Sequence, residues 1–166
     1  MVLNKGDFMK RILIALDYNP SAQKVAEAGY DLAKSMNAHT ILLHAIADVS
    51  YYSSLNYSPV MGFDSFGGIT EVYNADKLKE VAQGYLDKIK KHLGNEKIET
   101  LVRNGDSGET ILDTAAELKA DIIVMGTHSR SGFEKLLVGS VAENVLHHSL
   151  IPLYIIPTKT FEEKGL

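Results

Sequence analysis

The order of apolar and polar positions along the chain predicts five short strands. Segment 11–17, RILIALD, is a nearly continuous apolar run, as is typical of strands that are buried on both faces. Segments 40–46 and 121–126, TILLHAI and DIIVMG, have the same character. Segment 97–105 alternates, which predicts a less buried strand, and 152–157, PLYIIP, predicts a fifth strand whose flanking prolines suit a sheet edge.

The segments between these strands have the periodicity of amphipathic helices. Asn19 is expected to cap a first helix that begins at Pro20 and ends near Asn37. Gly94 occupies the position that glycine favours after a helix C-terminus, and it closes a second apolar stripe. The four predicted helices cover residues 20–37, residues 75–93, a segment capped by Ser107, and a segment that begins at Ser140.

Strand and helix alternate along almost the whole chain, which favours a parallel sheet with helices on both faces. We therefore predict one doubly wound α/β domain of five parallel strands over residues 1–166. Segment 47–74 lacks any periodicity and is rich in Tyr, Ser and Gly, and loops of this length are usually functional or disordered. Ligands of such sheets bind beyond the carboxyl ends of the strands, which here are Asp17, Ala45 with the residues after it, Gly105 and the segment 126–140.

Composition limits the chemistry that is available. The chain has no Cys, which excludes a disulfide framework, a thiolate metal site and a Cys nucleophile. It has neither an N-terminal apolar stretch of signal-peptide length nor any apolar run near ~18 residues, so we expect a cytoplasmic protein without a membrane span. The net charge is −4 and basic residues are scattered, which argues against nucleic acid as a partner.

Segment 126–140 is longer than a turn from strand to helix requires. Gly126 and Gly139 allow a tight turn and close approach of the backbone to a ligand. Ser140 begins a helix whose first N–H groups carry the positive end of the helix dipole, an arrangement that suits a phosphate. A capping box of Ser140 and Glu143 explains the same spacing equally well without any ligand.

The same segment resembles the nucleotide motif of the universal stress protein family, which is G-x-x-G, nine residues, then G-S or G-T. RILIALD, TILLHAI and VRNGDSGETIL resemble further parts of the family in the right order, so the likeness covers nearly the whole chain. Ser129 stands where the motif has its second glycine. If this position needs a positive φ, the Cβ of Ser129 weakens phosphate contact; otherwise its hydroxyl adds a donor.

The resemblance implies a Rossmann-like or flavodoxin-like fold of the adenine nucleotide alpha hydrolase-like kind, and a bound ATP or AMP that Mg²⁺ can accompany. It places Asp17 and the backbone of Ala15 and Ala45 beside adenine and ribose. The other residues that it implies surround the two glycines: Met125, Gly126, His128, Ser129 and Arg130 beside the ribose and phosphates, and Gly139, Ser140, Val141 and Ala142 closing the phosphate cradle.

In function, the resemblance implies a regulatory stress-response protein that binds an adenine nucleotide. It also implies a homodimer through the last strand, Leu153 to Ile156, which is a short apolar edge of the kind that is normally covered or paired. We expect no true catalysis, because nothing near residues 126–140 supplies a P-loop lysine or a clear water-orienting base. A slow ATPase and a nucleotide-free interaction protein are the alternatives.

The histidines predict no metal site. His147 and His148 are sequence neighbours, so on a helix they point about 100° apart and cannot share a metal as residues at i and i+4 can. We expect them to be a surface pair. His44 lies inside an apolar strand and is expected to be a hydrogen-bonded core residue.

Overall fold

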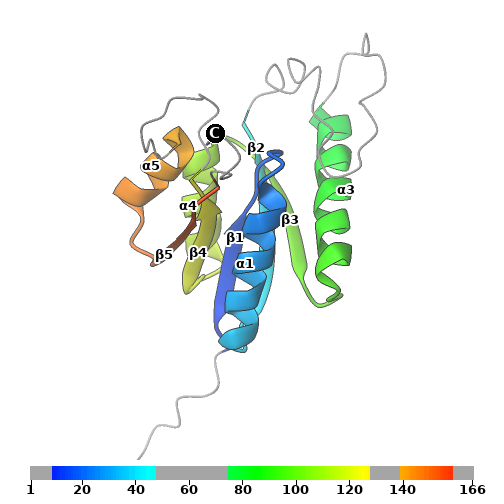
Figure 1. Ribbon diagram of the computed structural model, residues 1–166. Helices are drawn as coiled ribbons and strands as arrows, with labels where there is room; N and C mark the ends of the chain where they lie inside the picture. Colours follow the sequence, from blue (N-terminus) through cyan, green and yellow to red (C-terminus); the bar gives the residue numbers. More distant parts are fainter. Residues whose placement is uncertain (1–8, 48–74, 128–138, 159–166) are drawn as a thin grey trace, which may run out of the picture.

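One parallel sheet organises the protein, whose computed structural model describes residues 9–47, 75–127 and 139–158 (Figure 1). Neighbouring strands are parallel throughout, and their order is β3-β2-β1-β4-β5. The predicted doubly wound sheet is therefore confirmed, with β5 at one edge and the less buried β3 at the other. The strands are β1 (Arg11–Ala15), β2 (His39–Ile46), β3 (Glu99–Asn104), β4 (Ile122–Gly126) and β5 (Leu153–Ile156).

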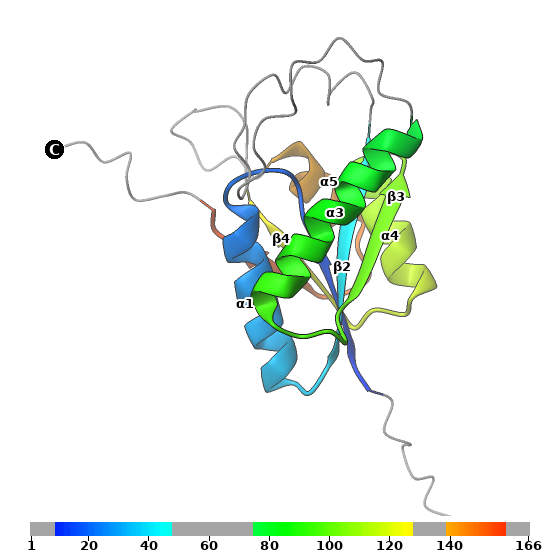
Figure 2. The same cartoon turned by 90° about the vertical axis from the view of Figure 1, so that its right-hand side faces the viewer.

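Helices cover both faces of this sheet. Helices α1 and α3 pack on one face, and α4 and α5 pack on the other (Figures 1 and 2). Each helix lies between two strands in sequence, as the alternating pattern predicts. The helices of the described residues are α1 (Ala22–Ser35), α3 (Ala75–Leu93), α4 (Ser107–Glu117) and α5 (Ser140–His148).

The central strands divide the core into two layers. In β1, Ile12 and Ile14 belong to the cluster under α1 and α3, whereas Leu13 belongs to the cluster under α4 and α5. In β4, Val124 belongs to the cluster under α1 and α3, and Ile123 belongs to the cluster under α4 and α5. Successive side chains of a strand point to opposite faces, so a strand with helices on both sides needs apolar residues at every position. This arrangement accounts for the continuous apolar runs in the sequence.

The strand order reverses between β1 and β4. From β1 the chain moves outward through β2 to β3, and α4 then carries it back to β4 on the other side of β1. The connections that leave the carboxyl ends of β1 and β4 therefore diverge to opposite faces of the sheet. Such a point is where open α/β sheets form a crevice for ligands.

The first helix begins two residues later than the sequence predicts. Asn19 was the expected cap and Pro20 the expected first residue, but Ser21 is the N-cap. The Oδ1 atom of Asn19 instead accepts hydrogen bonds from the backbone N of Ser21, at 3.1 Å, and from its Oγ, at 2.8 Å. These bonds hold Asn19 in a turn that precedes the helix.

The cap of α4 also differs from the prediction, by one residue. Asp106 is the N-cap, and its Oδ1 accepts a hydrogen bond of 3.0 Å from the backbone N of Glu109. Ser107, the predicted cap, is the first helical residue. The predicted C-terminal ends of α1 and α3 agree with the structure more closely than the predicted starts do. Asn37 and Gly94 follow these helices in left-handed conformations, with φ of 49° and 71°.

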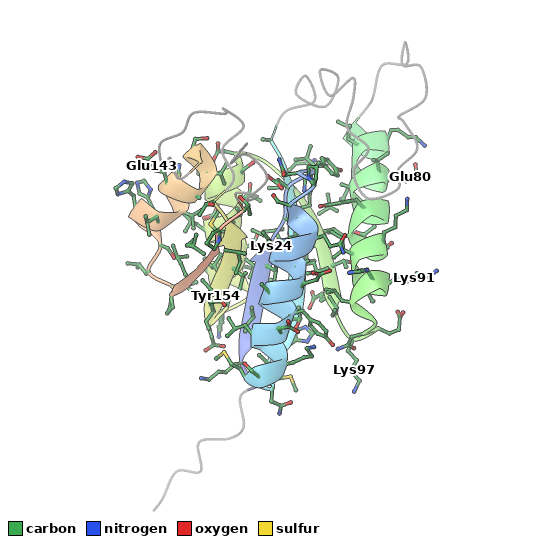
Figure 3. All side chains as sticks on the ribbon, viewed as in Figure 1. Lys24, Glu80, Lys91, Lys97, Glu143 and Tyr154 are labelled. Carbon is green, nitrogen blue, oxygen red and sulfur yellow. The ribbon has the colours of Figure 1, made fainter. Side chains whose placement is uncertain are left out.

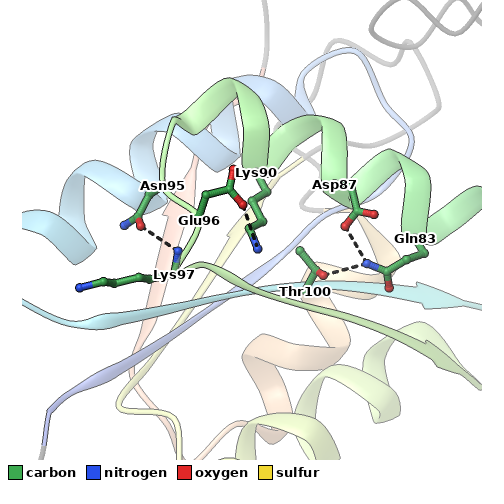
Figure 4. A network of polar contacts seen from close by, with 7 residues as sticks. All are labelled: Gln83, Asp87, Lys90, Asn95, Glu96, Lys97 and Thr100. Atoms are coloured by element: carbon green, nitrogen blue, oxygen red, sulfur yellow. Dashed lines mark hydrogen bonds and ion pairs between the residues drawn. The ribbon is translucent and has the colours of Figure 1, made fainter.

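Polar contacts attach α3 to the edge strand β3 (Figure 4). The Nε2 atom of Gln83 donates hydrogen bonds of 2.8 Å to the Oγ1 of Thr100 in β3 and to the Oδ1 of Asp87 in α3. Lys90 and Glu96 form an ion pair of 3.8 Å across the turn that leads into the strand. These contacts fix the rotation of α3 about its axis, and hence the direction of the side chains on its inner face.

Candidate functional site

A pocket of about 690 Å³ opens at the carboxyl edge of the sheet, where β1 and β4 diverge. This edge is the upper one in Figure 1, from which the chain leaves β2. The walls come from the ends of β1, β2 and β4, from the first turns of α1, and from the N-termini of α4 and α5. The pocket therefore lies at the place that the topology predicts.

Most of the residues that the sequence analysis selected meet in this pocket. His128, Ser129 and Arg130 lie outside the described residues, and their places beside the phosphates stay predictions. The segment 48–74 lies outside them as well. The selected residues that line the pocket are Ala15, Asp17, Ala45, Met125, Gly126, Gly139, Ser140, Val141 and Ala142.

The start of α5 forms one wall of the pocket and is not a capping box. Gly139 is the N-cap and Ser140 is the first helical residue, so Ser140 does not occupy the position that a capping box with Glu143 requires. That reading of the spacing is wrong. Because glycine has no side chain, the N-cap itself offers no acceptor to the first N–H groups of the helix, which have none within the helix either. Ser140, Val141 and Ala142, which carry these groups, all line the pocket.

The start of α4 reaches the same pocket but differs in charge. Asp106 lines the pocket, and its carboxylate already accepts the N–H of Glu109. The two helix starts pack closely, since a Cβ added to Gly108 would lie 2.9 Å from the Cγ of Asn144. The positive end of the α4 dipole thus has the carboxylate of Asp106 beside it. The cap of α5, Gly139, carries no charge. Asp106 had no expected role, because the cap was predicted at Ser107.

Gly126 serves close packing in the pocket wall. A Cβ on this residue would lie 2.8 Å from the Cγ2 of Thr158 and 3.0 Å from the Cγ2 of Val25. Both of these side chains line the pocket, and Thr158 is buried. The glycine is therefore needed so that residues from α1 and from the end of β5 can meet, a role that the sequence analysis did not anticipate.

His44 lines the pocket and is almost completely buried, with 3% of its surface exposed. Its Nδ1 lies 2.7 Å from the carbonyl oxygen of Leu16, which confirms the predicted hydrogen-bonded core histidine. Burial lowers the pKa of His44, against the opposing effects of this hydrogen bond and of the charge of Asp17. The imidazole is neutral at pH 7, and its Nδ1 carries the proton because a carbonyl oxygen only accepts.

Two tyrosines form an aromatic cluster with His44. The ring centroid of Tyr18, which lines the pocket, lies 4.2 Å from that of His44 and 4.8 Å from that of Tyr85. The hydroxyl of Tyr85 donates a hydrogen bond of 2.6 Å to the carbonyl oxygen of Asp17. Burial raises the pKa of both tyrosines, and the charge of Asp17 adds to the effect at Tyr85. Both phenols are therefore protonated donors at neutral pH.

The remaining histidine prediction is also confirmed, because His147 and His148 are exposed on α5. Within residues 9–47, 75–127 and 139–158, no group of three or more His, Cys, Asp or Glu side chains is placed to hold a metal ion. No helix in this part of the chain is both long and apolar enough to cross a membrane.

Comparison with known proteins agrees with the motif and the fold. A model of the universal stress protein family matches residues 9–157. Universal stress protein MJ0531 of Methanocaldococcus jannaschii is 29% identical over 159 residues, which are 94% of this chain and 86% of the relative.

Solved structures with the same fold cover similar lengths. The structure of protein MJ0577 of the same organism has a TM-score of 0.65 and 26% identity, covering 91% of this chain and 97% of that one. A universal stress protein in complex with cAMP has a TM-score of 0.62 and 20% identity, with coverages of 91% and 98%. The Archaeoglobus fulgidus universal stress protein in complex with dAMP has a TM-score of 0.57 and 20% identity, with coverages of 90% and 98%.

Proposed function

The chain belongs to the universal stress protein family, and from this premise we propose that it is a regulatory stress-response protein that binds an adenine nucleotide, acts as a homodimer and is not an enzyme. The observation that carries the nucleotide is the start of α5 in the pocket wall. There the first-turn N–H groups of Ser140, Val141 and Ala142 follow a glycine cap. A phosphate satisfies several such groups at once and also meets the positive end of the helix dipole.

The rest of the pocket suits a nucleoside. Its volume of about 690 Å³ lies within the range of small-molecule sites. Ala15 and Met125 offer apolar surface to a base, and the exposed carboxylate of Asp17 can accept hydrogen bonds from ribose hydroxyls. The relatives solved with cAMP and with dAMP hold ligands that share an adenine, a sugar and one phosphate. Their likeness to this chain establishes the fold, and the pocket supports the same ligand class here.

The proposal is one of binding without catalysis. It rests on the sequence near residues 126–140, which supplies neither a P-loop lysine nor a clear water-orienting base for phosphoryl transfer. A nucleotide held here acts through the conformation or partners of the protein. We therefore expect turnover of ATP far below the ~10 per second of a typical enzyme.

The proposal is tested by calorimetric titration of adenosine, AMP, ADP and ATP. Ser140→Ala should weaken the three nucleotides by about 1 to 2 kcal/mol, which is the cost of losing a hydrogen bond to a charged group, and should leave adenosine unchanged. Gly139→Val should abolish nucleotide binding, because its side chain enters the space next to the first N–H groups.

Two variants serve as matched controls for these changes. Ser35→Ala removes a hydroxyl that donates a 2.7 Å hydrogen bond to the carbonyl of Leu32, at the end of α1 away from the pocket, and Gly84→Val adds a side chain where no atom of the described residues lies within 4 Å. Both should bind as the unmodified protein does. If the unmodified protein binds no adenine nucleotide at millimolar concentration, the nucleotide-free alternative is correct.

A further inference from the structure

We propose that Tyr85 and His44 are positioning residues for the nucleoside end of the pocket, because they hold the turn at residues 16–18 from which Asp17 and Tyr18 face the ligand. The inference rests on the nucleotide-binding function proposed above. It assigns a binding role to Tyr85, which does not itself line the pocket.

The turn is held by donors from two distant elements. It follows directly after β1, and two of its successive carbonyl groups are engaged by side chains. The carbonyl of Leu16 accepts from His44 of β2 at 2.7 Å, and that of Asp17 accepts from Tyr85 of α3 at 2.6 Å. These partners lie 28 and 68 residues away in sequence. The position of the turn therefore depends on how β2 and α3 pack, and not on local turn geometry alone.

Burial makes both hydrogen bonds persistent. Tyr85 is fully buried and His44 is 3% exposed, so water does not compete for either donor. Removing a buried donor leaves its carbonyl partner unsatisfied, which is costly enough to move the backbone that carries it. The pKa of His44 is lowered by burial and that of Tyr85 is raised, so each group stays neutral and keeps its proton at pH 7.

The side chains of the turn meet the same two residues. The ring of Tyr18 lies against both His44 and Tyr85, with centroid distances of 4.2 Å and 4.8 Å. The carboxylate of Asp17 accepts a 3.0 Å hydrogen bond from the backbone N of Asn19, so its direction follows that of the turn. A shift of the turn would therefore displace one polar and one aromatic group of the pocket together.

The location of the turn determines which contacts with the nucleotide such a shift would weaken. The turn follows β1, whereas the N–H groups proposed for the phosphates lie at the start of α5 on the other face of the sheet. Loss of the Tyr85 hydroxyl should therefore weaken the contact with the nucleoside and leave the contact with the phosphates intact.

Tyr85→Phe tests the inference because it removes the hydroxyl and keeps the ring. We expect the dissociation constants of adenosine, AMP and ATP to rise by the same factor, roughly three- to tenfold, as for one lost hydrogen bond. The ratio of ATP to AMP affinity should stay as it is in the unmodified protein. Calorimetry of the three ligands measures all of these quantities.

Tyr30→Phe is the matched control. The hydroxyl of Tyr30 accepts a 3.0 Å hydrogen bond from Asn95, which also joins the α1 region to the α3 region, but Tyr30 does not line the pocket. This variant should lose thermal stability and keep the affinity for every ligand. If Tyr85→Phe behaves in the same way, its hydroxyl is only structural and the inference is wrong.

A second pair of variants tests His44 independently. In His44→Asn an amide nitrogen can take the place of Nδ1, whereas His44→Val leaves the Leu16 carbonyl without this donor. We expect His44→Asn to bind adenosine at least threefold more tightly than His44→Val.

Equal affinities for these two variants overturn the role of His44, and a loss confined to ATP in Tyr85→Phe overturns that of Tyr85. If the unmodified protein binds no nucleotide, it is the proposed function that fails.

Discussion

At the scale of single residues, Asp106 and Gly139 stand at equivalent positions, since each caps a helix that begins at the pocket. Only Asp106 carries a charge, and its carboxylate lies in the pocket wall. An anion bound at α5 is attracted by one helix dipole and repelled by this carboxylate. The number of phosphates that the pocket favours thus depends on a residue of the neighbouring helix.

Asp106→Asn should tighten nucleotide binding in proportion to the charge of the ligand. Asn caps a helix as well as Asp does, so α4 keeps its start and the pocket loses one negative charge. At a separation of ~10 Å in a pocket open to water, we expect a gain of about 0.5 kcal/mol for each phosphate charge and none for adenosine. The gain should fade in 1 M salt. Asp113→Asn, on the exposed side of the same helix, is the control, and an equal gain there would contradict the local effect.

His44 should make the stability of the fold depend on pH. Burial holds the pKa of folded His44 below the ordinary value of 6.5, so between these two values the unfolded chain binds more protons than the folded one. The free energy of unfolding should therefore be unaffected by His44 above pH 6.5 and should fall as the pH decreases below it, by at most ~1.4 kcal/mol per pH unit.

Urea unfolding between pH 5 and 8 measures this effect. His44→Asn should be less stable at neutral pH but should show a flatter dependence in this range. Glu27, whose pKa is lowered mainly by a hydrogen bond from Gln23, loses its contribution only near and below its ordinary pKa of 4.5, outside the measured range. Identical slopes for His44→Asn and the unmodified protein would contradict the prediction.

At the scale of the elements, the strands could be predicted because their burial requires a visible pattern. A strand with helices on both faces must be apolar wherever it is buried, as β1 is from Ile12 to Ala15, whereas the edge strand β3 mixes polar and apolar residues. Helix starts were less predictable, because Asp106 and Ser107 are both good caps and only the local backbone decides between them. The same one-residue ambiguity at Gly139 and Ser140 produced the incorrect capping box.

The candidate site could be predicted where it follows from topology and motif, and not where it depends on packing between distant elements. Asp17 and Ala45 were found because they lie close to the carboxyl ends of β1 and β2, where open α/β sheets bind ligands. Thr158 was missed, since its place beside Gly126 depends on how β5 and α1 meet across the sheet edge. In the sequence, Tyr85 is one position of the apolar stripe that predicts the helix over residues 75–93. No periodicity reveals that its hydroxyl reaches the carbonyl of Asp17.

At the scale of the whole molecule, apolar exposure is concentrated at one edge. Large apolar side chains that stay exposed in the described residues include Leu146, Leu150 and Tyr154, all of which belong to the segment from α5 to β5. Tyr154 lies on β5, whereas the charged side chains of Glu80 and Lys91 lie on α3, beside the opposite edge of the sheet (Figure 3). An edge strand beside exposed apolar side chains is the surface on which a second copy of the chain would pair.

We expect a homodimer in solution, joined through β5 of each copy across a two-fold axis. Light scattering at micromolar concentration should give twice the chain mass of 18.2 kDa. Tyr154→Lys should shift the mass toward that of the monomer, because it places a charge on the shared edge, and it should spare the fold because Tyr154 is already 42% exposed.

Met9→Lys, an equivalent change at a residue that is 61% exposed and precedes β1, should leave the dimer intact. The pocket and this edge are adjacent, since β5 leads through Pro157, whose carbonyl accepts a 2.9 Å hydrogen bond from Lys24, directly into Thr158 of the pocket wall. A monomer mass for the unmodified protein would rule out β5 pairing, and a dimer that survives Tyr154→Lys would place the interface elsewhere.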